Sequence, residues 1–230
     1  MQKKLSVPFM SSMMILFLSC GIYAAEWEVI KAPAEKGKVY NFYNVQFVNE
    51  NTGWIGGGGP HGESIPFLFT TDGGKNWEKI GKLKAGMFLF FNRNEGLLSG
   101  GNMLLQTKDS GRNWEKIPFI FDWHHRNNVR CIYFPHDRKH GWVGGSSLIA
   151  FTVDGGKTWS PGIKGMNPKT NEPVWPGGAV SSVCFPADNT TGWACSWYLY
   201  KTEDGGQNWK HIVSFYPRSC TSIVFTRDSK

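Results

Sequence analysis

Four aspartates of this 230-residue chain recur in one short pattern, T-x-D-[GS]-G-x-[NT]-W, which begins at Thr70, Thr107, Thr152 and Thr202. A carboxylate beside glycines could serve as a general acid or base or as a metal ligand. A catalytic centre, however, is assembled once from residues with different roles, whereas a segment present in four copies is typical of a structural unit. We therefore interpret the repeated residues as structural: Asp72, Gly74, Trp77, Asp109, Gly111, Trp114, Asp154, Gly156, Trp159, Asp204, Gly206 and Trp209.

Other residues that could do chemistry stand in three insertions that lengthen the repeat. Their sequences are GGGGPHGESIP, PFIFDWHHRNN and KGMNPKTNEPVWPGG. The repeated T-x-D-[GS]-G-x-[NT]-W pattern is called the box below. In a four-stranded repeat the three insertions fall on one face, opposite the turns that contain the box, and insertions on one face indicate the working surface. The candidate binding face consists of His61, Glu63, Asp122, Trp123, His124, His125, Arg126, Lys169, Glu172 and Trp175, with Arg130 on an adjoining strand.

Each of these candidates also has a simpler interpretation. His61 with His124 and His125 could bind a metal, but adjacent histidines point in different directions and no carboxylate stands at ligand spacing. The acids of the insertions could include a glycosidase pair, although surface loops routinely carry carboxylates. The two tryptophans could receive a sugar ring or a protein, or simply pack on the sheets. We predict no catalytic residue, metal or cofactor.

A second pattern precedes each box and predicts the elements that position it. A short apolar strand ends at Phe47, Phe90, Phe134 or Phe185, a polar turn follows, and Gly-Trp or Gly-Leu opens the next strand. A third strand runs into the box, and a fourth begins at its tryptophan. The sequence thus predicts an all-β fold: a β-propeller of four-stranded antiparallel blades over residues 26–230.

The propeller is expected to contain about four complete blades and two partial ones. Residues 27–30 resemble a fourth strand without its blade, and the segment ending at Phe225 resembles a first strand. We expect a truncated or open ring, whose exposed sheet edge would invite pairing. Within each box, the Asp72 carboxylate is expected to accept backbone N–H groups of a turn, while Gly73 and Gly74 permit positive φ.

These motifs resemble the Asp-box (BNR) repeats, and in particular the propeller family of photosystem II assembly and stability factors. The resemblance covers residues 27–230, and it implies a non-catalytic assembly role. Sialidases and other glycoside hydrolases carry the same boxes away from their active sites. A sialidase would also show an Arg-Ile-Pro motif and three arginines that clamp its substrate carboxylate. This chain lacks the motif, and among its arginines only Arg130 is expected on an innermost strand.

Residues 1–25 have the composition of a signal peptide. Two lysines precede an apolar stretch that is too short to span a bilayer comfortably, and small residues follow. Cleavage before Cys20 would make a lipoprotein tethered to the membrane surface, and cleavage after Ala24 or Ala25 would release an ordinary exported protein. We predict an exported protein, either periplasmic or lipid-anchored.

Charge and cysteine content restrict the choice of partners. Removal of Lys3 and Lys4 with the leader lowers the formal charge from +7 to +5, and the remaining basic residues are scattered, so we expect no nucleic-acid binding. In an oxidising compartment Cys184 and Cys195, which flank PADNTTG, could bridge if a hairpin there placed them opposite each other; two free thiols are the alternative.

The sequence as a whole favours an exported, non-catalytic binding or assembly scaffold with a protein partner. The alternative function is that of a sialidase-like or other glycoside hydrolase, or of a carbohydrate-binding propeller. A hydrolase should present paired acids in a deep channel. A scaffold should present a broad surface with aromatic and basic side chains.

Overall fold

The computed structural model describes residues 40–58, 64–84, 86–100, 103–118, 129–135, 137–146, 148–162, 165–166, 173–174 and 179–225. The chain divides into two compact units, Met1–Ala85 and Gly86–Lys230, and each is treated separately below. Within the described ranges there is no helix long and apolar enough to cross a bilayer. The predicted signal peptide, with Cys20 and the partial first blade at 27–30, lies outside the described residues.

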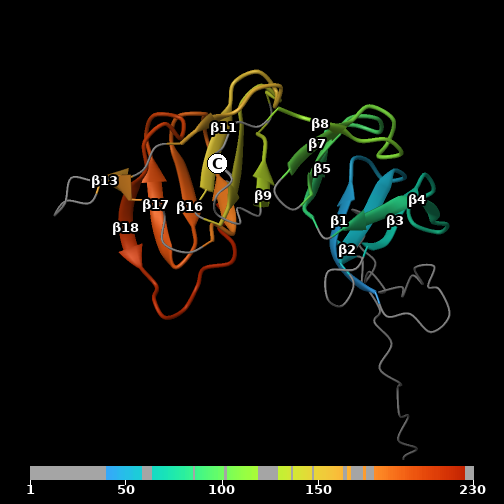
Figure 1. Cartoon of the computed structure of the whole chain (residues 1–230), viewed down its shortest axis with the longest axis horizontal. Coiled ribbons are helices and arrows are strands. Elements are labelled where there is room, and N and C mark those ends of the chain that lie inside the picture. Colours follow the sequence, from blue (N-terminus) through green and yellow to red (C-terminus); the bar gives the residue numbers. More distant parts are fainter. Residues whose placement is uncertain are drawn as a thin grey trace, which may run out of the picture. The chain divides into compact units, whose positions relative to one another are not determined.

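The described strands form four antiparallel sheets of four strands each, in simple meander order, which confirms the predicted blades (Figure 1). Blade I contains β1 (Asn41–Phe47), β2 (Gly53–Gly58), β3 (Ser64–Thr70) and β4 (Glu78–Lys84). Blade II contains β5 (Phe88–Phe90), β6 (Gly96–Gly100), β7 (Met103–Thr107) and β8 (Glu115–Lys116). Blade III contains β9 (Val129–Tyr133), β10 (Gly141–Gly145), β11 (Leu148–Thr152) and β12 (Ser160–Pro161). Blade IV contains β15 (Ser182–Cys184), β16 (Gly192–Cys195), β17 (Tyr198–Thr202) and β18 (Lys210–Ser214). A two-stranded hairpin, β13 (Gly165–Met166) with β14 (Pro173–Val174), occupies part of the third insertion.

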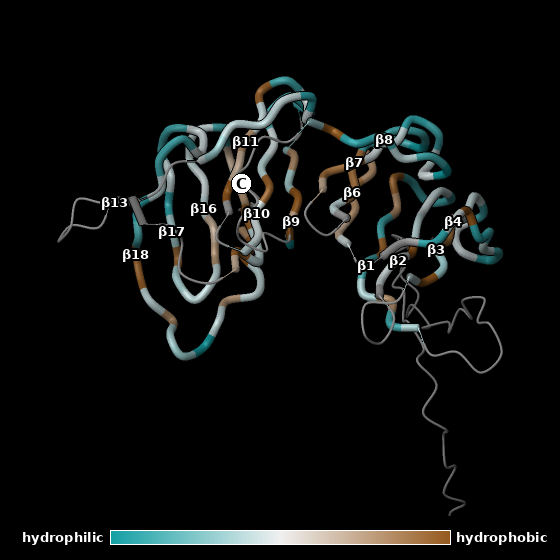
Figure 2. The backbone as a smooth tube through the Cα atoms, viewed as in Figure 1, coloured by the Kyte–Doolittle hydropathy of each residue, from teal (hydrophilic) through white to brown (hydrophobic). Residues whose placement is uncertain are grey.

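The middle strands β3 and β10 are buried along nearly their whole length. All five residues of β10 are buried, as are the last six of β3. Such strands lack the alternation of a half-exposed sheet because both of their faces are covered. In Figure 2 the apolar residues are concentrated on the strands and the polar residues on the turns. The sheets of the second unit therefore pack face to face and build the core between them.

One aromatic pair fixes the register of each blade. The strand-ending phenylalanine packs edge-on against the box tryptophan of its own blade, with ring centroids 6.2, 6.1, 6.0 and 6.1 Å apart in blades I to IV. The phenylalanine ring also lies over the glycine that opens the second strand. A Cβ at Gly141 or Gly192 would lie 2.3 Å from the nearest ring atom. Glycine is required there so that the ring can approach the backbone.

This register contradicts the expected placement of Cys184 opposite Cys195, on which the possible bridge depended. Cys184 pairs with Trp193, and Cys195 pairs with Ser182, so the two cysteines are not opposite each other. The observed register is the one that places the Phe185 ring over Gly192. All four described cysteines are free thiols in the structure.

The segment 220–225 occupies the position of a first strand of a further blade. Val180 N–H, at the start of blade IV, donates to Gly145 O at 2.9 Å, and Cys220 N–H donates to Ser196 O at 2.8 Å. The ring of Phe185 stacks on Trp142, and the ring of Phe225 lies 5.9 Å from that of Trp193. The predicted match of Phe225 to the earlier phenylalanines is therefore met in space, although residues 221–225 have no strand pairing.

Candidate functional site

The box turn has the same hydrogen bonds in all four blades. In blade I, Asp72 Oδ1 accepts the backbone N–H of Asn76 at 2.9 Å, and Oδ2 accepts its side-chain amide at 2.8 Å. Thr70 Oγ1 donates to Asp72 Oδ1 and accepts the N–H of Gly74 at 3.0 Å. The corresponding contacts recur around Asp109, Asp154 and Asp204. Both carboxylate oxygens are thus occupied within the turn.

These contacts stabilise the ionised carboxylates. Hydrogen bonds from the backbone and side chain of Asn76, and then from Thr70, lower the pKa of Asp72 to about 2. The pKa of Asp109 is lowered chiefly by the matching bonds from Asn113. Burial alone would raise the pKa of Asp154, but hydrogen bonds from Thr158 and Thr152 outweigh it and the pKa is lowered. An acid that is ionised and fully hydrogen-bonded is a poor proton donor at neutral pH.

The glycines and tryptophan of the box have matching structural roles. Gly155 and Gly156 have φ values of 78° and 89°, and Gly205 and Gly206 have 75° and 92°. Blade II places Ser110 in this left-handed region, with a φ of 66°. The indole N–H of Trp159 donates to Gly156 O at 3.0 Å, and that of Trp209 donates to Gly206 O at the same distance. In blades III and IV the box tryptophan therefore satisfies its polar group within its own turn.

A second repeated corner was missed by the sequence interpretation. In every blade an Asn or Asp side chain in the turn between the first two strands accepts the backbone N–H groups two and three residues later. The four residues are Asn49, Asn92, Asp137 and Asp188. A signal for them was present, because each stands four residues before the glycine that opens the second strand.

The two corners of one blade are joined by a backbone hydrogen bond. The N–H of the first box glycine, or of Ser110 in blade II, donates to a carbonyl of the first turn in all four blades, at 2.8 to 3.0 Å. In blade III this bond runs from Gly155 to Lys139. The Asp of the box and the Asn or Asp of the first turn therefore stabilise one continuous corner at the same end of the sheet.

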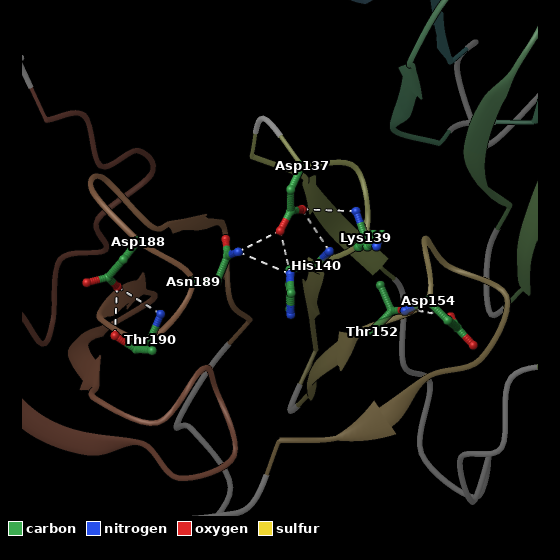
Figure 3. A network of polar contacts seen from close by, with 8 residues as sticks. All are labelled: Asp137, Lys139, His140, Thr152, Asp154, Asp188, Asn189 and Thr190. Carbon is green, nitrogen blue, oxygen red and sulfur yellow. Dashed lines mark hydrogen bonds and ion pairs between the residues drawn. The ribbon is translucent and has the colours of Figure 1, made fainter.

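Asp137 extends this corner into a contact between blades III and IV (Figure 3). Its Oδ2 accepts the Nδ1–H of His140 at 2.5 Å and the amide of Asn189 in blade IV at 2.6 Å. Burial alone would raise the Asp137 pKa, but hydrogen bonds from His140, Lys139 and Asn189 lower it to about 2. Asn189 also lies 3.1 Å from His140 Nδ1. Because that nitrogen already donates to Asp137, this second approach is a close contact and not a further bond.

Arg130 is the one member of the candidate binding face among the described residues. It lies on β9 with an exposed side chain, near the end of blade III that is opposite the box turn. The remaining candidates, His61, Glu63, Asp122, Trp123, His124, His125, Arg126, Lys169, Glu172 and Trp175, lie outside the described residues. The structure therefore does not test whether this face is assembled as predicted.

Among the described residues no group of three or more His, Cys, Asp or Glu side chains is arranged to hold a metal ion. Asp137 and His140 come closest, but each is used in the corner described above. The arrangement of the described acids is suited to holding turns and joining blades. It is the site of an Asp-box β-propeller, in which the repeated residues support the fold.

Comparison with known proteins agrees with this class. Residues 21–121, less than half of the chain, match the family model described as Photosynthesis system II assembly factor YCF48. The chain is therefore a BNR-type β-propeller that resembles YCF48. Among curated protein sequences, none matches the chain.

Solved structures of two kinds of propeller are similar to the chain. YCF48 from Cyanidioschyzon merolae is 19% identical with a TM-score of 0.52, over 80% of this chain and 59% of that one. An ancestral GH74 enzyme is 14% identical with a TM-score of 0.59, over 81% of this chain and 27% of that one. A YCF48 bound to a D1 peptide is 17% identical with a TM-score of 0.42, over 77% of this chain and 83% of that one. The chain thus spans little more than half of the algal protein and about a quarter of the enzyme.

Proposed function

We propose that the protein is an exported, non-catalytic β-propeller that binds a protein partner and acts in assembly. The observation that carries this proposal is the use of the repeated acids. Asp72 and its three equivalents are carboxylates that recur at one position in every described blade, and their oxygens are taken up by turn hydrogen bonds. The family match over residues 21–121 supports an assembly role.

The partner is proposed to bind at the end of the blades that carries the three insertions. Arg130 is exposed there, and a guanidinium is suited to bidentate contact with carboxylates or backbone carbonyls of a partner. In a photosynthetic organism the partner would be a photosystem II protein, since D1 supplies the peptide bound by one YCF48. In any other organism the same surface would serve an envelope assembly.

The test is a binding titration of the purified chain with a labelled D1 peptide, followed by fluorescence anisotropy. We expect saturable binding that weakens about tenfold in Arg130→Ala, the effect of losing roughly 1.4 kcal/mol of contact. Arg112→Ala is the matched control, because Arg112 is exposed in the box turn at the other end of a blade. Equal weakening by both variants would contradict the proposed face.

The glycoside hydrolase alternative makes a different prediction for the same preparation. Because GH74 enzymes share the fold, release of reducing ends from soluble polysaccharides should be assayed in parallel. We expect none above background. Turnover that Asp72→Asn abolishes, at an unchanged melting temperature, would overturn the non-catalytic proposal.

Export is supported by the composition of residues 1–25. The intact mass of the protein from an envelope fraction checks it. A chain that begins at a diacylated Cys20 supports the lipoprotein form, and one that begins after Ala24 or Ala25 supports the soluble form. Recovery of the uncleaved chain from the cytoplasm would contradict export.

A further inference from the structure

Two free cysteines meet where the segment 220–225 crosses blade IV. Cys195 is the last residue of β16 and is completely buried, whereas Cys220 is partly exposed. The thiol of Cys195 donates to Cys220 O at 3.4 Å, and the N–H of Cys220 donates to Ser196 O at 2.8 Å. Burial, and then the neighbouring Cys220 thiol, raise the pKa of Cys195. The backbone and the side chains of the two residues are therefore adjacent.

The junction of blades III and IV gives an independent Cβ–Cβ distance for the same pair of repeat positions. Gly144 in β10 corresponds to Cys195, since each is the third residue after the glycine that opens the second strand. Val180 corresponds to Cys220, since each stands five residues before the phenylalanine. A Cβ on Gly144 would lie 3.0 Å from Val180 Cβ. Disulfides require a Cβ separation of about 3.5–4.5 Å, so only a small adjustment separates these positions from bridging geometry.

A third contact shows that the two junctions are built alike. At the junction of blades III and IV, the Cys131 sulfur receives a backbone hydrogen bond from Val183. At the next junction, Ser182 Oγ accepts the N–H of Ile223 at 3.4 Å. Cys131 and Ser182 hold the same repeat position, as do Val183 and Ile223. The segment 220–225 is thus held as an added first strand, with cysteines at the two positions that face each other.

We propose that Cys195 and Cys220 form a disulfide that fastens the segment 220–225 to blade IV. The Cys220 thiolate attacks a small-molecule disulfide such as glutathione disulfide, which releases one glutathione thiolate and leaves a mixed disulfide. Cys195 then attacks the Cys220 sulfur, and its proton passes to the glutathione thiolate that this step expels. Two protein thiols are oxidised, and one glutathione disulfide is reduced to two thiols.

The remaining cysteines define the competing outcome. Cys131 is buried close enough to Cys195 to contribute to the rise of the Cys195 pKa. Cys184 is partly exposed in β15, where it contacts Tyr133. A bridge from Cys195 to Cys131 would lie inside the core and would leave the segment 220–225 untethered.

The test uses the full chain with Cys184→Ser, so that Cys195 is the only cysteine in its tryptic peptide, residues 170–201. The protein is oxidised with glutathione disulfide, alkylated, digested without reduction and analysed by mass spectrometry. We expect peptide 170–201 linked to peptide 219–227, which contains Cys220. A link to peptide 131–138, or alkylation of both thiols, would overturn the proposal.

A stability measurement separates a specific bridge from an accidental one. The oxidised protein should melt at a higher temperature than the reduced protein, because a cross-link restricts the unfolded chain. Cys220→Ser should remove this difference, and Cys131→Ser should preserve it. A linked protein that melts no higher than its reduced form would contradict a fastening role. These readouts are independent of partner binding, so the disulfide and the proposed function can fail separately.

Discussion

The two blade junctions of the second unit differ at the residue that follows the glycine opening the second strand. Between blades III and IV, Trp142 stacks on Phe185 with ring centroids 3.6 Å apart, and its indole N–H donates to Gly205 O at 2.9 Å. Between blades II and III the equivalent residue is Leu97, which belongs to a mainly aliphatic cluster. One substitution within the repeat therefore decides whether a junction includes a directional hydrogen bond.

The box glycines show the consequence of this difference. A Cβ on Gly206 would lie 2.6 Å from Trp142 Nε1, whereas a Cβ on Gly156 would lie 3.5 Å from Leu97 Cδ1. Both glycines have positive φ, so both avoid backbone strain. Only Gly206 is also required by the close approach of a neighbouring side chain.

The largest effect is expected from Gly206→Ala. Left-handed backbone strain of about 1–2 kcal/mol and overpacking of about 1–3 kcal/mol should together lower the free energy of unfolding by about 2–5 kcal/mol. The measurement is denaturant unfolding followed by tryptophan fluorescence. Gly156→Ala is the matched control and should cost only about 1–2 kcal/mol, because it has the strain without the clash. Equal losses in the two variants would contradict the comparison.

An intermediate effect is expected from Trp142→Leu, which gives blade III the residue of blade II. The lost ring pair and hydrogen bond should together cost about 1–3 kcal/mol in the same unfolding assay. The double variant Trp142→Leu with Gly206→Ala has no Trp142 ring for the new Cβ to meet. In that background Gly206→Ala should lower the free energy of unfolding by no more than Gly156→Ala does in the wild type. Strict additivity of the two changes would show that Trp142 is not what restricts Gly206.

The smallest effect is expected from Asp137→Asn, which removes the charge shared by His140 and Asn189. The side chains of Asp137 and His140 are each 36% exposed, so solvent screens the pair and the cost at pH 7 should be about 0–1 kcal/mol. Because hydrogen bonds lower the Asp137 pKa to about 2, its contribution is present above about pH 4 and is lost as the pH falls toward 2. The difference in melting temperature between wild type and variant should therefore shrink over that range.

Asp188→Asn controls for the turn alone in this experiment. It changes the same corner of blade IV, where the acid accepts from Thr190 and Thr191 and has no histidine partner among the described residues. A difference between wild type and Asp137→Asn that persists unchanged at pH 2 would argue that the charge of Asp137 is not involved.

Much of the fold was predictable because the repeat presents the same local sequence signals four times. The box pattern and the strand-ending phenylalanines predicted four-stranded blades, and β1 and β5 end at Phe47 and Phe90 as expected. The sequence left a Cys184–Cys195 bridge and two free thiols as alternatives, and the register argues against the bridge, because flanking a common turn does not determine register. The contact of the Phe185 ring with Gly192 determines the register, and this contact is a packing constraint. The turn acids at Asp137 and Asp188 were missed because their function depends on backbone groups that meet only in the folded turn.

The sequence by itself determined the class of protein, since the spacing of Thr, Asp, Gly and Trp in each box encodes a local turn that needs no distant residue. Only the tertiary structure decided which residues meet across blades. It placed Trp142 over the box of blade IV, joined Asp137 to Asn189, and brought Cys220 beside Cys195. Such contacts depend on how one sheet packs on the next, and no spacing within a single repeat records that packing.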